Sequence, residues 1–320
     1  GGQPLLEKNK IIALTKFITP QKTKVHYSIE TNATLLTNDV IEELYKNHIG
    51  IGISIDGDRK CHDLQRTFVS GKGSYDTVKK NLLQAQRYYK NKIGTITTIT
   101  KQTAVHIEKI IEHLVLDLHI SNIKLNFVHA STYTHGQNQC LNTQEIADTE
   151  LRILYKIIEL QERGYDVMEH NIFIKLKNLL FREYADICLS CGCCGGEKMI
   201  VFDMDGNIYP CELTDDASFV IGSIYKKESL IEQIKMTIDK DKAFFKMKKA
   251  VECEKCYWKF FCRGGCTVRA LSEKRQMEVI DIDHIECAIN QVLYPALMEL
   301  VLRKPHIVNQ MLGEDLLVDE

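Results

Sequence analysis

The residues best able to do chemistry are cysteines, and most of them lie in the second half of the chain. Ten of the twelve cysteines fall within residues 188–287, and the densest block has the spacing Cys253-x2-Cys256-x5-Cys262-x3-Cys266. Thiolates at this spacing can be brought around one metal centre by a turn or two of chain. A metal site is therefore the first function that the sequence indicates.

The number of clustered cysteines indicates more than one centre. A structural zinc ion or a 4Fe–4S cluster takes four protein ligands, so ten cysteines can supply two sites with two thiols left over. Disulfides are the alternative, but the sequence has no recognisable signal peptide, and a chain of 320 residues does not need covalent cross-links to hold its core. The spacing alone does not distinguish zinc from iron–sulfur.

The composition excludes several classes of partner. Hydrophobic residues make up 44% of the chain, and 41 Lys and Arg side chains stand against 43 Asp and Glu, which gives a net charge of -2. This balance offers no general attraction to nucleic acid or to an anionic membrane. No apolar run is long enough to span a bilayer, so we expect a cytoplasmic protein without nucleic-acid or membrane partners.

Alternating helical and strand-like segments precede the cysteines and must position any site built with them. Apolar spacing predicts strands at residues 25–29, 49–55, 93–99 and 123–128, and helices at 5–17, 37–45, 74–89 and 107–118. Strands separated by one helix each predict right-handed crossovers and a parallel sheet or barrel. A long amphipathic helix is expected at 143–164, a β-hairpin at 199–202 and 208–211, and a packing helix at 288–302.

Polar residues gather where these strands end. Glu30, Thr31 and Asn32 follow one strand, Ser54 and Asp56 end the next, and Asn126 lies near the end of a later one. Each of them alone could simply cap a helix or a turn. Together they predict a binding site, because the carboxyl ends of parallel strands meet at one edge of the sheet.

Several short motifs resemble, in order and spacing, those of a radical S-adenosylmethionine (radical SAM) domain. These motifs are Gly1-Gly2-Gln3-Pro4-Leu5-Leu6, Glu30-Thr31-Asn32-Ala33-Thr34-Leu35-Leu36, Ser54-Ile55-Asp56-Gly57, His62-Asp63 with Arg66, and Gly71-Lys72-Gly73-Ser74-Tyr75. The later cysteines resemble the SPASM extension of that family, which has Gly-x4-Cys, C-x2-C-x5-C-x3-C and a final cysteine. Gly206 to Cys211, the 253–266 block and Cys287 match these parts, so the resemblance covers nearly the whole chain.

The resemblance implies two auxiliary 4Fe–4S clusters with interleaved ligands. One cluster would be held by Cys253, Cys256, Cys262 and Cys287. The other would be held by Cys211 and Cys266 with two partners from the preceding group, for which we choose Cys191 and Cys194. Cys188 and Cys193 remain alternatives to these two.

The resemblance also implies contacts with S-adenosylmethionine. Gly1, Gly2 and Gln3 occupy the place of the glycine-rich bend that contacts the methionine amino group, although Gln3 stands where the family more often has an acidic residue. Ser54 and Arg66 match positions used for the methionine carboxylate, which suits the forked Arg side chain. Asn32 and Asp56, at the ends of the first two strands, complete the predicted cofactor-binding set.

One departure from the family concerns the catalytic cluster. Radical SAM enzymes hold it through C-x3-C-x2-C after the first barrel strand, and no such triad occurs in the sequence, where Cys61 and Cys140 stand alone and are expected to be buried. We therefore expect an N-terminally truncated chain that does not cleave S-adenosylmethionine by itself. The predicted fold is α/β: a partial (β/α)6 barrel missing its first strand, with a small SPASM domain of a β-hairpin and helices.

The expected domains follow from this resemblance. They are a partial barrel at residues 1–140, a bridging helical segment at 141–187, the auxiliary-cluster domain at 188–287, and a C-terminal helix and tail at 288–320. The motifs around 191–196 and 209–215 look most like maturases that install thioether links in ribosomally made cysteine-rich peptides. Such an enzyme implies a precursor peptide and an electron donor such as ferredoxin or flavodoxin as partners.

Two alternatives remain open. An anaerobic sulfatase-maturating enzyme, which makes formylglycine from cysteine or serine, has an Asp proposed as the base after the hairpin cysteine, where this chain has Glu212. Glu212 is accordingly the candidate catalytic residue, although a turn carboxylate is more often structural. A non-enzymatic zinc-binding scaffold would explain the cysteine block but not the polar residues at the strand ends.

Overall fold

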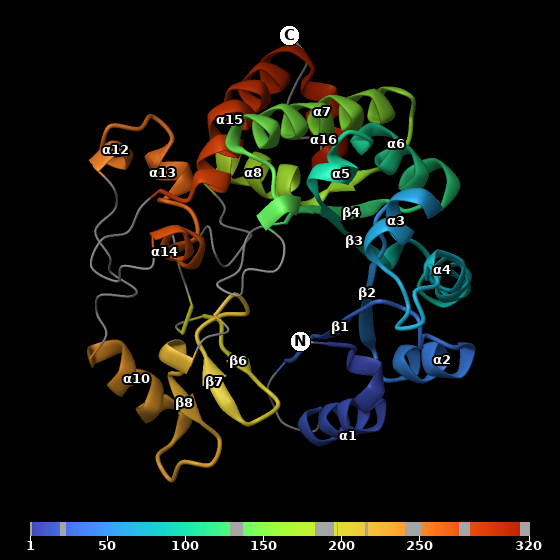
Figure 1. The fold of residues 1–320 in the computed structure, drawn as a ribbon. Coiled ribbons are helices and arrows are strands. Elements are labelled where there is room, and N and C mark those ends of the chain that lie inside the picture. Colours follow the sequence, from blue (N-terminus) through green and yellow to red (C-terminus); the bar gives the residue numbers. More distant parts are fainter. Residues whose placement is uncertain are drawn as a thin grey trace.

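A five-stranded parallel sheet forms the centre of the molecule (Figure 1). The computed structural model describes residues 2–19, 24–128, 137–182, 195–196, 198–214, 217–240, 251–274 and 282–313. In the order of the sheet, which is also chain order, the strands are β1 (Tyr27–Thr31), β2 (Ile49–Ser54), β3 (Gly94–Ile99), β4 (Asn122–Phe127) and β5 (Met168–Glu169). Neighbouring strands in the sheet are thus consecutive in the chain, as the alternating pattern predicts.

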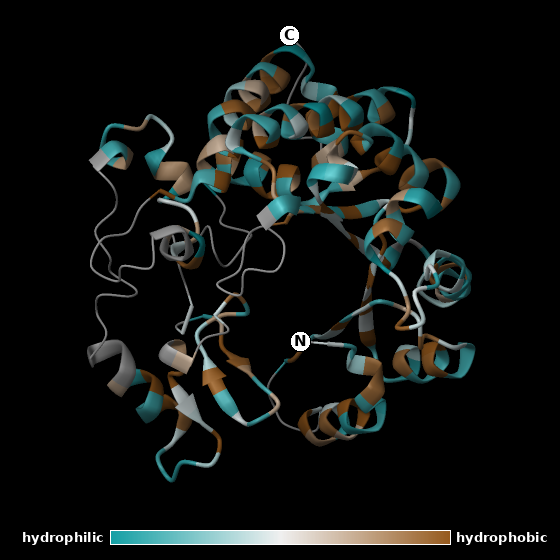
Figure 2. Ribbon diagram, in the orientation of Figure 1, coloured by the Kyte–Doolittle hydropathy of each residue, from teal (hydrophilic) through white to brown (hydrophobic). Residues whose placement is uncertain are grey.

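Helices connect the strands and cover the outer side of the sheet (Figure 1). They are α1 (Lys8–Ile18), which follows a 3-10 turn at Pro4–Glu7, α2 (Asn38–Lys46), α3 (Arg59–Gln65), α4 (Tyr75–Tyr89), α5 (Lys101–Ala104), α6 (Ile107–Glu112), α7 (Thr143–Glu162) and α8 (His170–Phe181). Hydrophobic residues are concentrated where these helices meet the sheet, and hydrophilic residues lie outside (Figure 2). Burial of this apolar stripe is the main stabilising term for such helices.

Strand β2 alternates between a packed face and a face with small side chains. In β2, Ile49, Ile51 and Ile53 are buried, whereas Gly50 and Gly52 lie on the other face. Because successive side chains of a strand point to opposite sides, the isoleucines pack against the helices while the glycines leave the second face without bulk. This second face ends at Ser54, one of the predicted cofactor contacts.

The predicted elements are found with small shifts, and several further elements were not predicted. The first strand begins at Tyr27 rather than residue 25, and the helix expected at 107–118 becomes α6 followed by a π-helical turn at His113–Asp117. Around the main sheet, the segments without a prediction are α3, α5, β5 and α8. Helix α3 has few apolar residues and depends on its N-cap, where the Asp58 side chain accepts from the Cys61 N–H at 2.9 Å.

A second, antiparallel sheet carries the predicted hairpin. It consists of β6 (Val201–Phe202), β7 (Asn207–Tyr209) and β8 (Gly222–Ser223), and it lies on the opposite side of the molecule from α2 and α4 (Figure 1). The Asp203 carboxylate holds the turn by accepting from the N–H groups of Asp205 and Asn207, and Gly206 has a φ of 78°. The hairpin prediction is therefore confirmed, and its second strand ends two residues before Cys211.

The C-terminal part of the described chain is helical. Its elements are α10 (Leu230–Lys240), α12 (Val251–Glu254), α13 (Lys259–Cys262), α14 (Thr267–Lys274), α15 (His284–Arg303) and α16 (Pro305–Leu312). Helix α15 packs along α7 and against α8 and α16, so the C-terminal helices share a core with the main sheet. It also begins four residues before the predicted start at 288, which places Cys287 in its first turn.

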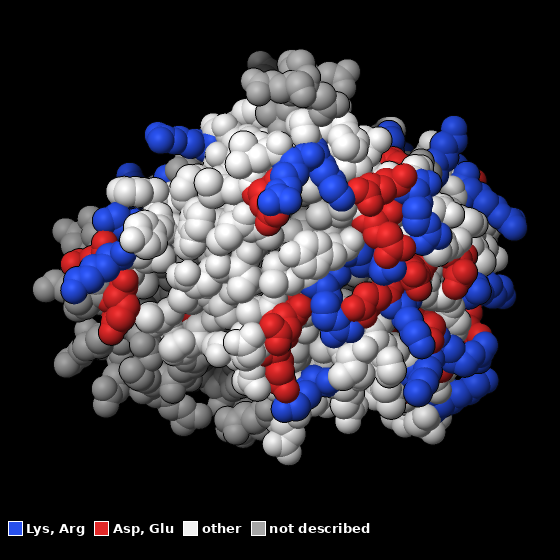
Figure 3. All heavy atoms as spheres, turned by 90° about the horizontal axis from the view of Figure 1, so that it is seen from above, with Lys and Arg blue, Asp and Glu red and all other residues white. Residues whose placement is uncertain are grey.

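Helix α15 also bears on the membrane prediction. Within the described ranges it is long and apolar enough, by length and composition alone, to cross a bilayer, so the expectation that no segment qualifies is wrong. Its buried side chains, among them Leu293 and Leu297, belong to the core formed with α7. Acidic and basic side chains are interspersed on the face drawn in Figure 3, beside a broad uncharged area, as the near-zero net charge leads one to expect.

Candidate functional site

The end of β1 brings together two of the predicted cofactor-binding residues. Gln3 Nε2 donates to Asn32 Oδ1, and Thr31 Oγ1 donates to Gln3 Oε1 at 2.7 Å. The Gln3 side chain is therefore oriented across the carboxyl end of the strand. Its carbonyl oxygen has a second lone pair, so it can still accept from an ammonium group. Gly2, which has a φ of 82°, precedes it, and Gly1 lies outside the described residues.

The end of β2 holds a buried carboxylate. Asp56, 1% exposed, pairs with Arg66 through Nε at 2.5 Å and Nη2 at 3.2 Å. Gln65 Nε2 and the Thr98 N–H also donate to it, at 2.6 and 2.9 Å. The Asp56 carboxylate therefore accepts hydrogen bonds from two side chains and one backbone N–H. The two predicted ligand contacts thus bind each other, and Arg66 faces Asp56 where we expected it to face a ligand.

A buried histidine connects the other motif residues of this region. His62 Nδ1 accepts from the Asp56 N–H at 3.2 Å, so the ring proton lies on Nε2, which is 3.0 Å from Ser74 Oγ. Ser74 Oγ in turn donates to the Arg66 carbonyl at 2.8 Å. Burial lowers the pKa of His62 and keeps the ring neutral. The histidine therefore fixes the loop that presents Arg66.

Steric crowding by Asp63 explains why the Gly71 to Tyr75 motif has glycine at position 73. The Asp63 carboxylate accepts from the Tyr75 N–H at 2.9 Å at the start of α4. A Cβ atom added to Gly73 would lie 2.1 Å from Asp63 Cγ, so a larger residue there would displace the carboxylate. The His62, Asp63 and Gly73 motif residues thus support the strand-end site, which we define as Gln3, Asn32, Asp56 and Arg66.

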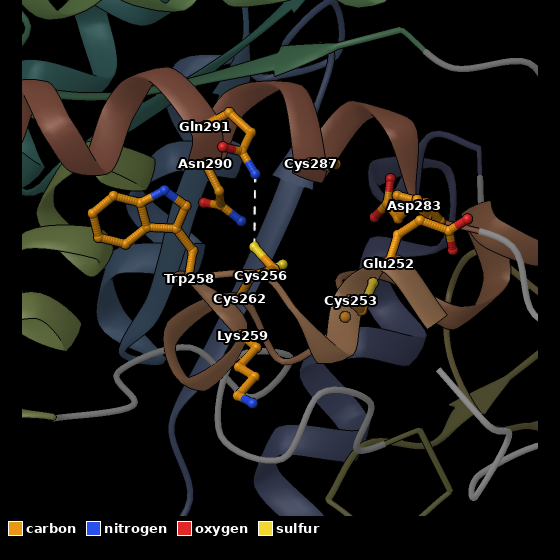
Figure 4. Close-up of a pocket in the computed structure, with 12 residues that line it drawn as sticks. Glu252, Cys253, Cys256, Trp258, Lys259, Cys262, Asp283, Cys287, Asn290 and Gln291 are labelled. Carbon is orange, nitrogen blue, oxygen red and sulfur yellow. Dashed lines mark hydrogen bonds between the residues drawn. The ribbon is translucent and has the colours of Figure 1, made fainter. Parts of the chain in front are cut away.

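Four of the predicted metal ligands line a single pocket. Cys253 on α12, Cys256, Cys262 at the end of α13 and Cys287 on α15 surround a hollow of about 590 Å³ that is open to solvent (Figure 4). Trp258, Asp283, Asn290 and Gln291 also line it. Cysteines up to 34 positions apart in the sequence thus meet in one place, which we call the cysteine pocket.

The cysteine pocket offers a set of four sulfur donors, the set that a 4Fe–4S cluster requires. Among the described residues, no three His, Cys, Asp or Glu side chains are gathered as closely as a single metal ion would need. In a 4Fe–4S cubane each of the four irons binds one thiolate, so the four ligand sulfurs surround the cluster and do not converge on one point. The four cysteines that line the walls of the pocket fit that requirement.

The surroundings of two of these cysteines, Cys262 and Cys287, disfavour the thiolate form. Burial raises the pKa of Cys262 to about 11, with a further contribution from Glu286. Burial also raises the pKa of Cys287, and the neighbouring Cys256 and Cys253 raise it further. Bound metal would supply the positive charge needed to deprotonate such a group of sulfurs. No disulfide joins any two of the eight described cysteines.

The predicted ligands of the other cluster are described only in part. Cys211 is buried after β7, and its Sγ accepts from the Leu213 N–H at 3.2 Å. Cys266 does not line the cysteine pocket with its three neighbours in the motif, which agrees with a separate role. Cys191 and Cys194, with the alternatives Cys188 and Cys193, lie outside the described residues. The isolated Cys61 is buried and Cys140 is half-buried.

Asp283 links the two groups of cysteines, and sequence reasoning missed it. Its carboxylate, buried within the fold, accepts from the Cys266 N–H at 2.7 Å and from Arg269 Nη2 at 2.6 Å. It also caps α15 by accepting from the Glu286 N–H at 3.2 Å, while its carbonyl accepts from the Cys287 N–H at 2.8 Å. One side chain thus fixes the start of α15 relative to Cys266.

Glu212, the candidate catalytic residue, is exposed on the turn after Cys211. It therefore stands beside a predicted ligand of the second cluster, at the surface. The candidate role of Glu212 in catalysis therefore depends on its place directly after Cys211 in the sequence.

Comparisons with known proteins give two kinds of similarity. No protein-family model matches the chain. The cysteine-type anaerobic sulfatase-maturating enzyme of Clostridium novyi (strain NT) is 26% identical over 273 residues, which cover 83% of this chain and 71% of that protein. The serine-type anaerobic sulfatase-maturating enzyme of Klebsiella aerogenes is 22% identical over 278 residues, 83% of this chain and 65% of that protein. These relatives confirm the prediction of an enzyme.

Solved structures share the architecture. Native anSMEcpe with bound AdoMet and Cp18Cys peptide superposes with a TM-score of 0.80 at 21% identity, covering 98% of this chain and 84% of that chain. Streptococcus suis SuiB bound to precursor peptide SuiA gives a TM-score of 0.64 at 18% identity, covering 89% of this chain and 64% of that chain. The α/β fold with a parallel sheet is therefore the fold of proteins that bind AdoMet and peptides.

Proposed function

We propose that the chain belongs to a radical SAM enzyme that modifies a peptide and holds two auxiliary 4Fe–4S clusters. The observation that carries the proposal is the convergence of Cys253, Cys256, Cys262 and Cys287 on one pocket. Similarity to sulfatase-maturating enzymes over 83% of the chain supports it independently. When bound, AdoMet together with a reducing cluster would supply the radical chemistry that removes hydrogen from the substrate. The C-x3-C-x2-C ligands of that cluster do not occur in residues 1–320.

The cysteine pocket would hold one auxiliary cluster, and Cys211 and Cys266 would hold the other. We keep Cys191 and Cys194 as the remaining ligands of the second cluster. Gly195, which follows Cys194 in the sequence, packs against Pro210: a Cβ on Gly195 would lie 3.0 Å from the Pro210 carbonyl oxygen. Since Pro210 precedes Cys211, this contact supports a common site for Cys194 and Cys211.

The strand-end site would bind AdoMet. Gly2, Gln3 and Asn32 would contact its methionine amino group through backbone and amide oxygens. Ser54, at the carboxyl end of β2, would contact the carboxylate. Because Arg66 is paired with Asp56, we assign this pair the task of shaping the site, in place of the direct carboxylate contact expected from the sequence.

The substrate class that the relatives favour is a sulfatase peptide whose cysteine or serine becomes formylglycine. This was our second interpretation of the sequence, and the named relatives fit it better than thioether formation. In that reaction Glu212 would accept a proton from the substrate side chain, and a ferredoxin or flavodoxin would exchange electrons. Thioether formation in a cysteine-rich precursor stays as a second candidate, because Glu212 stands where sulfatase-maturating enzymes have Asp.

Two measurements test the proposal. Anaerobic reconstitution with iron and sulfide should give about eight irons per chain and charge-transfer absorbance. Stoichiometric zinc without that absorbance would overturn the iron–sulfur assignment. The product of the whole gene should then be incubated with AdoMet, a reductant and a cysteine-containing sulfatase peptide. Mass spectrometry separates the candidates, since formylglycine replaces sulfur by oxygen whereas a thioether only loses hydrogen.

A further inference from the structure

Hydrogen-bond donors from one helix point at the sulfur atoms of the cysteine pocket. Gln291 Nε2 donates to Cys256 Sγ at 3.6 Å. Asn290, one residue earlier on α15, lines the same pocket as Cys262 and Cys287. Figure 4 places both amides on the same stretch of α15, facing the cysteines. The ligand sulfurs of a bound cluster would therefore receive N–H donors from the protein.

The orientation of Asn290 is fixed by a buried lysine. Lys175 Nζ lies 2.6 Å from the Asn290 side-chain oxygen. An ammonium group can only donate, so the amide atom facing it must be the oxygen and the NH2 group must face the other way. That NH2 group lies 3.1 Å from Glu286 Oε1 and is the group available to Cys262. Lys175 thus fixes the orientation in which the NH2 group of Asn290, and not its oxygen, is available to the Cys262 sulfur.

Lys175 is itself held by a buried ionic network. Its side chain is 6% exposed, pairs with Glu286 at 2.5 Å and lies over the Tyr294 ring at 5.6 Å. Glu286 also pairs with Arg269 at 3.3 Å. A lysine is buried only where partners compensate its desolvation, and a buried charge is weakly screened by solvent and salt. The Lys175–Glu286 pair therefore holds the side chain of Asn290 in a fixed orientation.

We propose that Asn290, Gln291 and Lys175 raise the reduction potential of the cluster in the cysteine pocket. The inference rests on the proposed function, since it concerns the cluster assigned there. The reduced cluster carries one electron more than the oxidised cluster, so donors and cations near its sulfurs stabilise the reduced state more. Gln291 acts by its hydrogen bond to Cys256, and Asn290 acts by the NH2 group that it presents to the pocket. Lys175 is a positioning residue that acts through Asn290.

The first experiment replaces Gln291, which is exposed and can be changed without disturbing the core. In an anaerobic titration with dithionite followed by electron paramagnetic resonance, Gln291→Leu should lower the midpoint potential of one cluster. We expect roughly a tenfold change in the ratio of oxidised to reduced cluster, equivalent to ~59 mV for one electron. Glu299→Gln is the matched control, because Glu299 is exposed on the same helix about 12 Å further along and should leave the potential unchanged.

The second experiment tests the lysine. Lys175→Met should lower the same midpoint potential, and Lys175→Arg, which keeps a donor-only cation, should restore it. If Lys175→Met does not fold, as judged by circular dichroism, Gln291→Leu decides alone. Full iron content with an unchanged potential in Gln291→Leu overturns the inference and leaves the proposed function standing. A parent protein without an iron–sulfur signal overturns both.

Discussion

A buried acid on α7 gives a quantitative prediction that does not depend on any cofactor. Glu150 is 4% exposed, and burial raises its pKa to about 8, with Glu169 and Glu286 nearby raising it further and Lys175 opposing them. At neutral pH Glu150 is therefore mostly protonated in the folded protein. Its neutrality leaves the Lys175–Glu286 pair electrically balanced.

The sign of the pH dependence follows from this raised pKa. An unfolded glutamate releases its proton near the ordinary value of 4.5, while the folded protein retains it up to about 8. Stability is therefore lost as pH rises through this window, at about 1.4 kcal/mol per pH unit. Relative to a pH well below 4.5, the ionisation of Glu150 in the unfolded chain lowers the free energy of unfolding by about 3 kcal/mol at pH 7. At pH 5 the decrease is less than about 1 kcal/mol.

Glu150→Gln should remove that loss, because an amide has no proton to release. Urea unfolding followed by circular dichroism should show Glu150→Gln more stable than the parent by about 3 kcal/mol at pH 7 and nearly equal at pH 5. Glu159→Gln is the control on the same helix. Glu159 is exposed, and ion pairs with Lys156 and Arg163 lower its pKa, so its replacement should weaken the protein slightly at neutral pH. A Glu150→Gln effect that is constant with pH would refute the reasoning.

Three further predictions concern the two sites. Cys253→Ser and Cys266→Ser should each reduce iron from about eight to about four per chain, measured by anaerobic iron and sulfide assay, because they belong to different clusters. If both substitutions removed the same spectroscopic signal, the separate assignment would be wrong. Asp283→Ala should cost about 3 kcal/mol of unfolding free energy in a urea titration, since it removes the closer of the two carboxylates that pair with Arg269 and also the cap of α15. Asp283→Asn, which keeps an acceptor, should cost less, and equal losses would show that the cap is unimportant. Gly73→Ala should cost about 2 kcal/mol by the same assay through its contact with Asp63. The cost should fall in an Asp63→Ala background, and an unchanged cost would exclude that contact as the cause.

The parts of the fold that sequence predicted well are those set by local periodicity. Strand β2, with isoleucine at alternate positions, and α4, with Ser74 at its N-cap, appear within a residue of their predicted bounds. The signal is strong because burial on one face recurs at a fixed period. The short β5 and the polar α3 give no such signal. Their formation depends on tertiary partners, such as the pairing of β5 with β4.

The candidate site was predictable where ligands are close in the chain. Cys253, Cys256 and Cys262 lie within ten residues, so their spacing alone predicts a shared centre, and the structure places them around one pocket. The pairing of Asp56 with Arg66 was not predictable, because spacing does not tell whether a charge faces a ligand or another side chain. Asp56 was placed correctly at a strand end, and its contact with Arg66 changes the role assigned to both residues.

Helix α15 carried a signal that periodicity could have revealed. Glu286, Asn290 and Gln291 interrupt an otherwise apolar helix at spacings of four and five residues, which puts them with Cys287 on adjoining parts of its surface. A buried polar group costs about 1–3 kcal/mol unless it finds a partner, so the buried Asn290 in an apolar stretch calls for an explanation other than the stability of the helix. Their partners are Lys175 and the sulfurs of the cysteine pocket. The helix that completes the core therefore also presents to the four cysteines the donors on which the potential of a bound cluster depends.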